Sequence, residues 1–466
     1  MSNKLIRGMY DVLVANVVNL LTSAITTLIL PKFLSIDTYA LLKSYQLYIN
    51  CTAILQFGYV DGMYLKYGGR NVSDIDKKEW NETVSTLRIF QLFFTAIGCA
   101  IALYAHSILV FLVAIVIMPI SVTGLLKQFY QAVGEFKEYK FVMILNTVFV
   151  FLANMAILFV MNSDNGYVYL IAYDVIYILL WLLLETQIKR KCSSKIFLLA
   201  FDMKKLIAYV KSGILLTFGN YSSYILISMD RWFIKFLLDN FAFAQYSFAA
   251  SLEGFLTVAV TPITITLYNF FCKESDMGKI RRMRNIVMIF SSGLVASAFG
   301  VKFIIRIWLL DYMDSINVIF ILFASHFFYT LNKGIYVNLY KSGRKQKLYF
   351  KRLLMVIVIG FFANVGIYTI YKGYMSFAIG TLLSSMFWLM LSVNDFKECY
   401  FAKKELIYMS GVLTLFLLCG FLLNPIVGFA VYVVCVFSLT ALLLRNDGWA
   451  LLEIAKEKFS SLGLVK

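Results

Sequence analysis

Three ionisable side chains lie inside long apolar stretches of this sequence. Glu253 and His326 fall near the middle of two apolar runs, and Asp174 lies nearer one end of a third. A charged side chain at the centre of a bilayer costs about 2.5–3.5 kcal/mol on insertion scales, so such residues usually face a cavity, a partner or an ion pathway. Carboxylates hold protons or cations, and histidine titrates near neutral pH. Asp174, Glu253 and His326 are therefore candidates for ion coupling, with a hydrogen-bonded packing role as an equal alternative for His326.

Two cations, Lys43 and Arg231, also lie inside apolar runs. Lys and Arg both pair with phosphate oxygens, and Arg can do so through two parallel hydrogen bonds. Positive charge in a membrane cavity suits an anionic ligand such as a diphosphate, so we predict a substrate-binding cavity that includes Lys43, Arg231 and Glu253. Asp230 points to a helix face about 100° away from Arg231. We therefore predict that Asp230 pairs with a neighbouring helix.

Other charged residues in or near the apolar runs have a less specific interpretation. Long basic side chains can extend their charged ends to the nearer membrane surface while their aliphatic stems stay in the apolar region. Acidic and basic residues close to the end of a run are expected at the interface. By these criteria we expect surface anchoring for Lys302, Arg306 and Lys333, and interfacial positions for Asp61, Arg88 and Asp395.

Membrane-spanning helices are the elements that must position these residues. The chain is 61% hydrophobic and only 15% charged, whereas soluble globular chains carry about 25% charged residues. A helix needs about 20 residues to cross the hydrocarbon core, and the runs lack the alternation of a membrane β-barrel. We predict an all-α integral membrane protein of about 14 transmembrane helices, near 10–32, 38–60, 84–106, 108–133, 140–162, 166–188, 213–238, 241–271, 286–309, 316–340, 353–372, 374–396, 405–424 and 426–445.

The basic residues predict the orientation of these helices. Most of the 43 Lys and Arg residues lie in the two tails and in every second connection, while connections such as Met161 to Gly166 and Asn424-Pro425 carry none. Cytoplasmic loops retain Lys and Arg during insertion. The alternation places both termini in the cytoplasm and also accounts for the net charge of +17. A nucleic-acid partner is not expected, because the basic residues form no continuous stripe.

A repeated pattern of residues predicts how the helices are grouped. The sequence from Lys32 to Ala40 after the first run resembles that from Lys235 to Ala242 after the seventh. Six helices separate the two copies, and an even number makes the halves parallel repeats. We predict a six-helix lobe at 1–188, a basic cytoplasmic linker at 189–212, a second six-helix lobe at 213–396, and two extra helices with a tail at 397–466. Within the linker, Lys204 to Lys211 forms either an amphipathic surface helix or a plain basic connection.

Several classes of chemistry are not supported by any motif in the chain. The sequence has no GxxxxGK[ST] phosphate loop and no HExxH pair, and its 7 cysteines lack metal-ligand spacing. The predicted outer connections are too short to hold a glycosyltransferase site. We therefore expect a carrier and not an enzyme, with no cofactor and no metal site.

Particular segments resemble a known family. They are Lys211 to Ser223 with Asp230-Arg231, Ala244 to Phe248 with Thr261-Pro262, the start through Leu30 to Leu34, and Gln128 to Tyr139. Together they resemble the polysaccharide-exporting branch of the MOP flippase superfamily, and most of all the O-antigen flippases. The resemblance implies a two-lobed bundle with alternating access and a cationic cavity lined mainly by the first, second, seventh and eighth helices. The chain has fewer basic cavity candidates than the murein lipid flippase branch would lead one to expect.

The same resemblance implies a substrate and a location. It implies an undecaprenyl-diphosphate-linked oligosaccharide that is moved from the inner to the outer leaflet of the bacterial inner membrane, coupled to an ion gradient. The expected partners are this lipid-linked oligosaccharide, the membrane lipids and the polysaccharide polymerase machinery. Two alternatives remain open: a multidrug exporter of the same superfamily, and a membrane component of a polysaccharide polymerase system.

Overall fold

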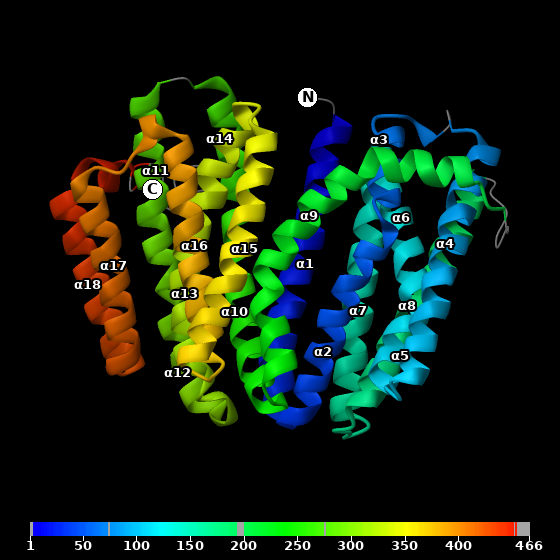
Figure 1. The fold of residues 1–466 in the computed structure, drawn as a ribbon, viewed down its shortest axis with the longest axis horizontal. Helices are drawn as coiled ribbons and strands as arrows, with labels where there is room; N and C mark the ends of the chain where they lie inside the picture. Colours follow the sequence, from blue (N-terminus) through cyan, green and yellow to red (C-terminus); the bar gives the residue numbers. More distant parts are fainter. Residues whose placement is uncertain (1–2, 73–74, 193–199, 275, 452, 454–466) are drawn as a thin grey trace. The chain divides into compact units, whose positions relative to one another are not determined.

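The computed structural model describes residues 3–72, 75–192, 200–274, 276–451 and 453, with side chains omitted at 3–13, 189–192 and 269. Throughout these residues the secondary structure is helical, with no strand. The chain divides into two compact units, residues 1–221 and 222–466, which are drawn in Figure 1. The predicted lobe and linker bounds at 188, 212 and 396 remain predictions.

In its described residues, the first unit contains eight α-helices, a short 3₁₀ turn and the first part of a ninth helix. In chain order these are α1 (Asn3–Phe33), α2 (Ile36–Thr52), η1 (Ala53–Gln56), α3 (Tyr59–Tyr67), α4 (Lys77–Tyr104), α5 (Ile108–Ile115), α6 (Ile117–Ala132), α7 (Phe136–Phe159), α8 (Gly166–Cys192) and α9 (Met203–Leu237). The division between the units falls within α9.

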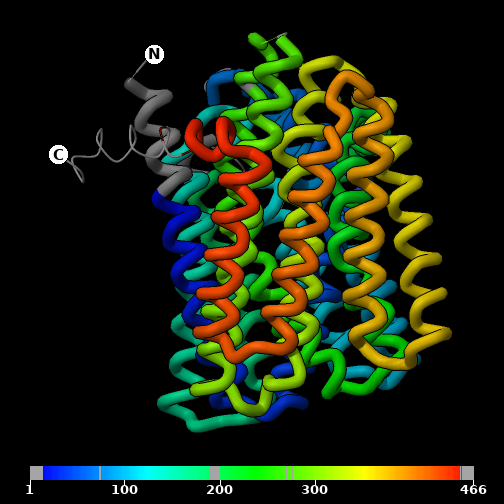
Figure 2. The backbone as a smooth tube through the Cα atoms, turned by 90° about the vertical axis from the view of Figure 1, so that its left-hand side faces the viewer, coloured from blue at the N-terminus to red at the C-terminus, as the bar shows by residue number. Residues whose placement is uncertain are grey.

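In its described residues, the second unit continues from α9 with the following α-helices and short 3₁₀ and π segments. These are α10 (Asn240–Lys273), α11 (Met277–Val295), α12 (Ser297–Trp308), η3 (Leu310–Tyr312), α13 (Ser315–Leu331), the π segment η4 (Asn332–Tyr336), α14 (Val337–Ser342), α15 (Gln346–Ile370), α16 (Met375–Asp395), η5 (Lys397–Cys399), α17 (Lys403–Leu422) and α18 (Pro425–Leu443). Figure 2 shows α17 and α18, in orange and red, as neighbouring long helices.

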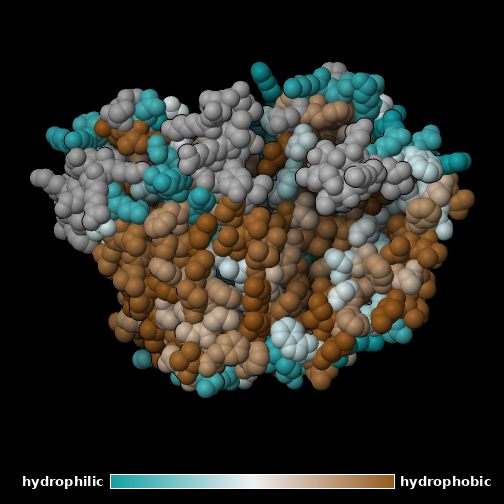
Figure 3. Space-filling model, turned by 180° about the vertical axis from the view of Figure 1, so that it is seen from behind, coloured by the Kyte–Doolittle hydropathy of each residue, from teal (hydrophilic) through white to brown (hydrophobic). Residues whose placement is uncertain are grey.

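The predicted fold class is confirmed. Twelve helices within the described residues are long and apolar enough to cross a membrane. The two remaining predicted spans, 38–60 and 213–238, correspond to α2, which has 17 residues, and to α9, which is interrupted by charged side chains. The protein is therefore all-helical with about fourteen membrane helices. The face drawn in Figure 3 carries a broad hydrophobic band with hydrophilic residues gathered above and below it.

Polar breaks between the apolar runs end one helix and cap the next. The Ser35 hydroxyl accepts a hydrogen bond from Thr38 N at 3.3 Å, and the Asp239 carboxylate accepts one from Ala242 N at 2.8 Å. Asn424 does the same for α18 at 2.9 Å from Val427 N, and Pro425 follows it at the first helical position. These side chains satisfy backbone N–H groups that have no partner within the helix. Short polar breaks are therefore sufficient to turn the chain between helices.

Corresponding helix pairs pack together in the two units. In the first unit α4 packs on α6, α6 on α8, and α7 on α8; in the second unit α11 packs on α13, α13 on α16, and α15 on α16. When the membrane spans are counted from the N-terminus, each of these pairs in the second unit lies six spans after the matching pair in the first unit. The packing within each unit therefore agrees with the parallel pseudo-repeat of the predicted fold class.

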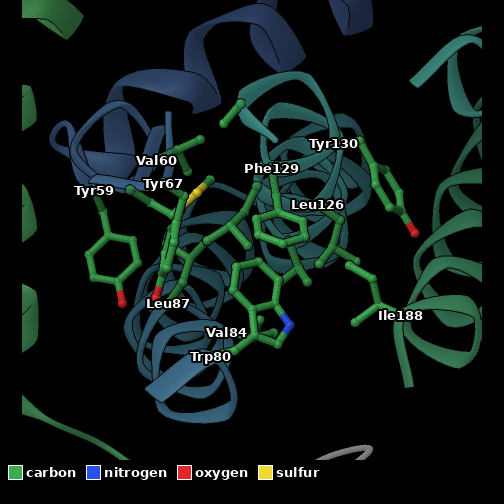
Figure 4. Packing of buried hydrophobic residues seen from close by; sticks show 14 of the residues in the cluster. Tyr59, Val60, Tyr67, Trp80, Val84, Leu87, Leu126, Phe129, Tyr130 and Ile188 are labelled. Atoms are coloured by element: carbon green, nitrogen blue, oxygen red, sulfur yellow. The ribbon is translucent and has the colours of Figure 1, made fainter. Parts of the chain in front are cut away.

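One end of the first unit is filled by an aromatic core. Trp80 lies against Phe129 with ring centroids 4.0 Å apart, and Tyr67 meets both rings edge-on, as Figure 4 shows. The start of α9 joins this core through Leu206 and Tyr209, so the segment from Lys204 to Lys211 is a helix with one buried face rather than a plain linker. This core fixes the beginning of α9 to the first unit.

A glycine crossing brings α9 into close contact with α3. A Cβ atom at Gly213 would lie 2.0 Å from the Gly58 carbonyl oxygen, and one at Gly62 would lie 2.1 Å from the Tyr209 carbonyl oxygen. No other residue fits at either position without moving the backbone. The glycines therefore let the two helices approach until their backbones touch.

Lys302, which we expected to be a surface anchor, and Arg88, which we expected at the interface, are both buried between helices. Lys302 is only 2% exposed and donates to the carbonyl oxygens of Gly420 and Leu423, at 2.5 and 2.7 Å. Arg88 is 4% exposed and forms an ion pair with Glu185 at 2.5 Å. In both cases a buried acceptor from another helix satisfies the charge, and sequence position could not reveal that acceptor. Lys302 holds the end of α17, and Arg88 joins α4 to α8.

Candidate functional site

A polar cavity of about 230 Å³ lies inside the second unit. It is enclosed by α9, α10, α13, α15 and α16, so it depends on helices from the whole of that unit. Three of the residues predicted from the sequence line it: Asp230 and Arg231 from α9, and Glu253 from α10. The folding of α9 against α10 and α16 brings these charges together within a region of the chain that is otherwise strongly apolar.

Asp230 is held by hydroxyl groups of two other helices. It is 4% exposed and accepts hydrogen bonds from Tyr246 Oη at 2.5 Å and Thr381 Oγ1 at 3.2 Å. The backbone N–H of Arg231 also donates to Asp230 Oδ1, at 2.7 Å. Asp230 thus connects α9 with α10 and α16 through hydrogen bonds, where the sequence had led us to expect an ionic partner.

Glu253 and His326 form a pair that joins α10 to α13. The carboxylate of Glu253 is hydrogen-bonded to Nδ1 of His326, and the imidazole side chain has no exposed surface. Nε2 of the same ring is buried and has no hydrogen-bond partner among the described residues. Because the Glu253 side chain is 21% exposed and lines the cavity, the pair presents its carboxylate to the cavity and keeps the imidazole behind it.

Arg231 lines the same cavity, and its guanidinium does not have a full set of hydrogen-bond partners among the described residues. Its side chain is half-buried and lines the cavity, and its Nε atom is buried without a hydrogen-bond partner in the described part of the chain. No ion pair of Arg231 with a side-chain carboxylate lies within 4.0 Å among the described residues. A guanidinium in this state is available to an anion or to water.

Two uncharged lining residues also carry buried polar atoms that have no hydrogen-bond partner within the part of the chain that the structure describes. These are Oδ1 of Asn364, from α15, and Nε1 of Trp388, from α16. Buried polar groups are nearly always hydrogen-bonded, and exceptions mark sites where water or a ligand binds. Carboxylate, hydroxyl and amide oxygens, as supplied by Asp230, Thr381 and Asn364, are also the ligands that hard cations take. The cavity can therefore bind water, a small cation or a polar group of a larger ligand.

The other two predicted site residues belong to the first unit. Lys43, from α2, lies 5.2 Å from the centre of the Tyr39 ring, with Nζ 3.4 Å from Oε1 of Gln46. Asp174, from α8, is 5% exposed and accepts a hydrogen bond from the Tyr45 hydroxyl of α2. Neither residue lines the cavity of the second unit. Their roles in substrate binding and ion coupling remain predictions.

Reasoning from charge alone missed the uncharged part of this site. Asn364 is the clearest case, because it is an amide in the apolar stretch Ile357 to Ile367 and is 1% exposed. An isolated amide in a membrane helix was a usable signal. Thr381 and Trp388 gave no such signal, because hydroxyl and aromatic residues are common in membrane helices. Among the described residues, no group of three or more His, Cys, Asp or Glu side chains could hold a metal ion.

The arrangement of helices matches two solved transporter structures. The lipid II flippase MurJ, in an inward closed conformation, matches with a TM-score of 0.60 over 95% of this chain and 99% of its own, at 12% sequence identity. A mutant of the Vibrio cholerae MATE transporter VcmN matches with a TM-score of 0.51 over 88% of this chain and 98% of its own, at 10% identity. No protein-family model matches the sequence, and no curated protein matches it. Both structural neighbours belong to the MOP superfamily, and at these identities they establish the fold of this chain.

Proposed function

We propose that this protein is an alternating-access flippase of the bacterial inner membrane. Its substrate is an undecaprenyl-diphosphate-linked oligosaccharide, the repeat unit of O-antigen or another surface polysaccharide, which it moves from the inner to the outer leaflet. The observation that carries the proposal is the fold, which matches that of a lipid II flippase over 95% of the chain. Both termini lie in the cytoplasm, as the distribution of Lys and Arg requires.

The diphosphate of the substrate binds to the cations of the membrane helices. Arg231 supports this assignment because its Nε has no protein partner, while its side chain lines a cavity. A guanidinium can donate two parallel hydrogen bonds to a phosphate group. Lys43, from α2, supplies a second positive charge, and Glu253 receives hydroxyl groups of the sugar. This division of roles separates recognition of the anionic linkage from recognition of the glycan.

The ion gradient acts on the acidic residues of the membrane helices. In the second unit Glu253 with His326 forms a proton-accepting pair, and Asp230 with Thr381 and Asn364 offers oxygen ligands for a cation. Asp174 is the corresponding candidate in the first unit. Occupation of these groups changes the charge inside a helix bundle, and such a change biases one packing of the helices over another. The protein needs no cofactor or catalytic residue for this work, and it works beside the polysaccharide polymerase machinery.

Accumulation of lipid-linked repeat units in cells that lack the protein tests this function. The diphosphate-linked oligosaccharide is expected to build up on the inner leaflet and surface polysaccharide to fall, with recovery by the wild-type chain. Arg231→Gln should fail to restore the polysaccharide, whereas Lys347→Gln, which alters an exposed cation, should restore it. Normal surface polysaccharide in the deleted cells would contradict the proposal.

The second candidate function is export of cationic drugs. It is favoured by the match to a MATE transporter, whose TM-score of 0.51 is lower than that of the flippase. A cavity for cationic drugs would be acidic or apolar, so Arg231 and Lys43 would oppose binding. Replacing both cations with Gln should then increase drug resistance in a susceptible host. A flippase of an anionic lipid would instead lose activity in the same double variant.

A further inference from the structure

An apolar groove of about 980 Å³ lies between α11 and α18 of the second unit, on other helix faces than the polar cavity. Phe290 and Leu294 form the α11 side, and Val433, Val436 and Phe437 form the α18 side. Phe437 is 69% exposed and Val433 is 42% exposed. Side chains of this type, facing outward in a membrane helix, contact lipid. The groove is thus a recess in the lipid-facing surface.

Buried polar contacts at both ends hold the walls of the groove in place. At one end Lys302 donates to Gly420 O and Leu423 O, which holds the turn between α17 and α18. At the other end Asn285, of α11, donates to Glu405 Oε1 at 2.8 Å and to Asp447 Oδ2 at 2.9 Å. Because polar contacts fix both ends, closing the middle would require breaking buried hydrogen bonds. The recess is therefore a lasting feature of this unit.

Gly293 leaves room on the floor of the groove. A Cβ atom built at this position would meet no protein atom within 4 Å. An unfilled apolar space of this size beside lipid is occupied by hydrocarbon, because an empty groove would leave its lining atoms without van der Waals contacts. The shape and lining of the groove therefore suit an acyl chain.

The groove has a polar mouth at the end of α18. Arg445 and Trp449 line it there, and both are exposed, Trp449 to 56%. Trp449 also lines an adjoining polar recess together with Arg281 and Arg282. Tryptophan is enriched where the bilayer meets water, and arginine pairs with phosphate through two hydrogen bonds. The mouth combines the two side chains that favour the headgroup of an anionic lipid.

We propose that this groove binds one anionic phospholipid of the inner leaflet. One acyl chain lies between α11 and α18 over Gly293, and the phosphate is held by Arg445 with Trp449 beside it. This proposal is based on the shape and lining of the groove, and it does not depend on the transport function proposed above. The site would supply a fixed lipid that stabilises the packing of α17 and α18 on the second unit.

Native mass spectrometry of the purified full-length protein tests the site. The protein is equilibrated in separate detergent mixtures with phosphatidylglycerol, with phosphatidylcholine and with undecaprenyl phosphate. The wild type should retain one phosphatidylglycerol. Gly293→Leu places a branched apolar side chain in the groove, starting from a Cβ position with no protein atom within 4 Å, and should lower retention at least about tenfold. Arg445→Gln should remove the preference for phosphatidylglycerol over phosphatidylcholine, which one basic contact makes about fivefold.

Two variants serve as matched controls. Gly366→Leu adds the same side chain at another glycine with open space around it, in α15, and Lys404→Gln removes an exposed charge of α17 that does not line the groove. Both should bind phosphatidylglycerol as the wild type does. Equal retention of the two phospholipids by the wild type, unchanged retention by Gly293→Leu, or retention of undecaprenyl phosphate in place of phospholipid would overturn the proposal. If Gly293→Leu does not fold, Arg445→Gln still decides, because its side chain is exposed.

Discussion

Arg284 and Arg231 are two arginines of the second unit whose surroundings are opposite. Arg284, of α11, has no exposed surface and donates to Glu405 Oε2 at 2.5 Å and to Cys399 O at 2.6 Å, with its guanidinium 4.2 Å from the centre of the Phe401 ring. Arg231 lines a cavity and leaves Nε without a partner. A charge whose acceptors are complete holds helices together. A charge whose acceptors are incomplete is available to a ligand, and this difference separates Arg231 from Arg284.

The largest effect on stability is expected at the completed site. Arg284→Met should destabilise the protein by about 3–5 kcal/mol, because it leaves the buried Glu405 carboxylate without its ionic partner. Arg281→Met is the control, since Arg281 is exposed and donates to a single backbone oxygen, at 2.6 Å from Glu398 O. Thermal unfolding in detergent measures both variants. An equal unfolding temperature for Arg284→Met and the wild type would show that this network does not hold α17 in place.

The incomplete site should behave in the opposite way. Arg231→Gln should destabilise the protein much less than Arg284→Met, because the buried Asp230 beside it loses a neighbouring charge but keeps its hydrogen bonds from Tyr246 and Thr381. Its transport of the lipid-linked oligosaccharide should nevertheless fall at least about tenfold, since a charge-assisted contact to a phosphate is lost. Arg231→Lys should recover part of the activity by restoring charge without the two-pronged geometry. A variant that is strongly destabilised would place Arg231 among the structural cations.

The carboxylates provide a sharper comparison between the two units. Glu253→Gln keeps a side chain of the same size beside His326 but can no longer change its charge, so transport should lose its dependence on an imposed ion gradient. Asp174, in the first unit, accepts a hydrogen bond from the Tyr45 hydroxyl. Asp174→Asn tests whether removing this carboxylate also makes transport independent of the gradient. Transport rates with and without a gradient measure both variants. Full gradient dependence in Glu253→Gln would exclude the Glu253–His326 pair from coupling.

A smaller loss of stability than that of Arg284→Met is expected from a single hydroxyl. Tyr246→Phe removes one of the two side-chain hydroxyl groups that donate to Asp230, the other being Thr381. Loss of one such hydrogen bond should cost about 1–3 kcal/mol, because the carboxylate is buried. Tyr268→Phe, at an exposed hydroxyl of the same helix, should leave the unfolding temperature unchanged. Equal unfolding of the two variants would mean that Asp230 is already satisfied without Tyr246.

The sequence predicted the helices better than the partners of individual charges. Hydrophobic runs and the alternation of Lys and Arg depend only on local composition, so the all-helical fold and about fourteen spans could be derived from them. The burial of Lys302 and Arg88 could not be predicted, because their acceptors, Gly420 O and Glu185, come from helices far along the chain. The lobe bounds remain predictions. The two units divide at residue 221, inside α9, where neither the charge nor the hydropathy of the sequence marks a boundary.

The candidate site was predictable only in its charged part. Arg231 and Glu253 could be selected because charge is rare in membrane helices, and the structure places both on one cavity. Asn364 and Trp388 became visible only through their unpartnered polar atoms, which depend on the packing of α15 and α16. The sequence shows where a charge would be costly to bury, and such residues can be selected from it. It does not show which polar atoms lie close enough to form a hydrogen bond.

Translocation in proteoliposomes tests the central claim most directly. The purified protein is reconstituted with an undecaprenyl-diphosphate-linked oligosaccharide in both leaflets, and an enzyme added outside digests the glycan chains that it can reach. Within a fixed short time in which the wild type exposes nearly all of the glycan, Arg231→Gln should leave close to half of it protected, as in liposomes without protein. Half protection with the wild type, or full exposure with Arg231→Gln, would contradict the account.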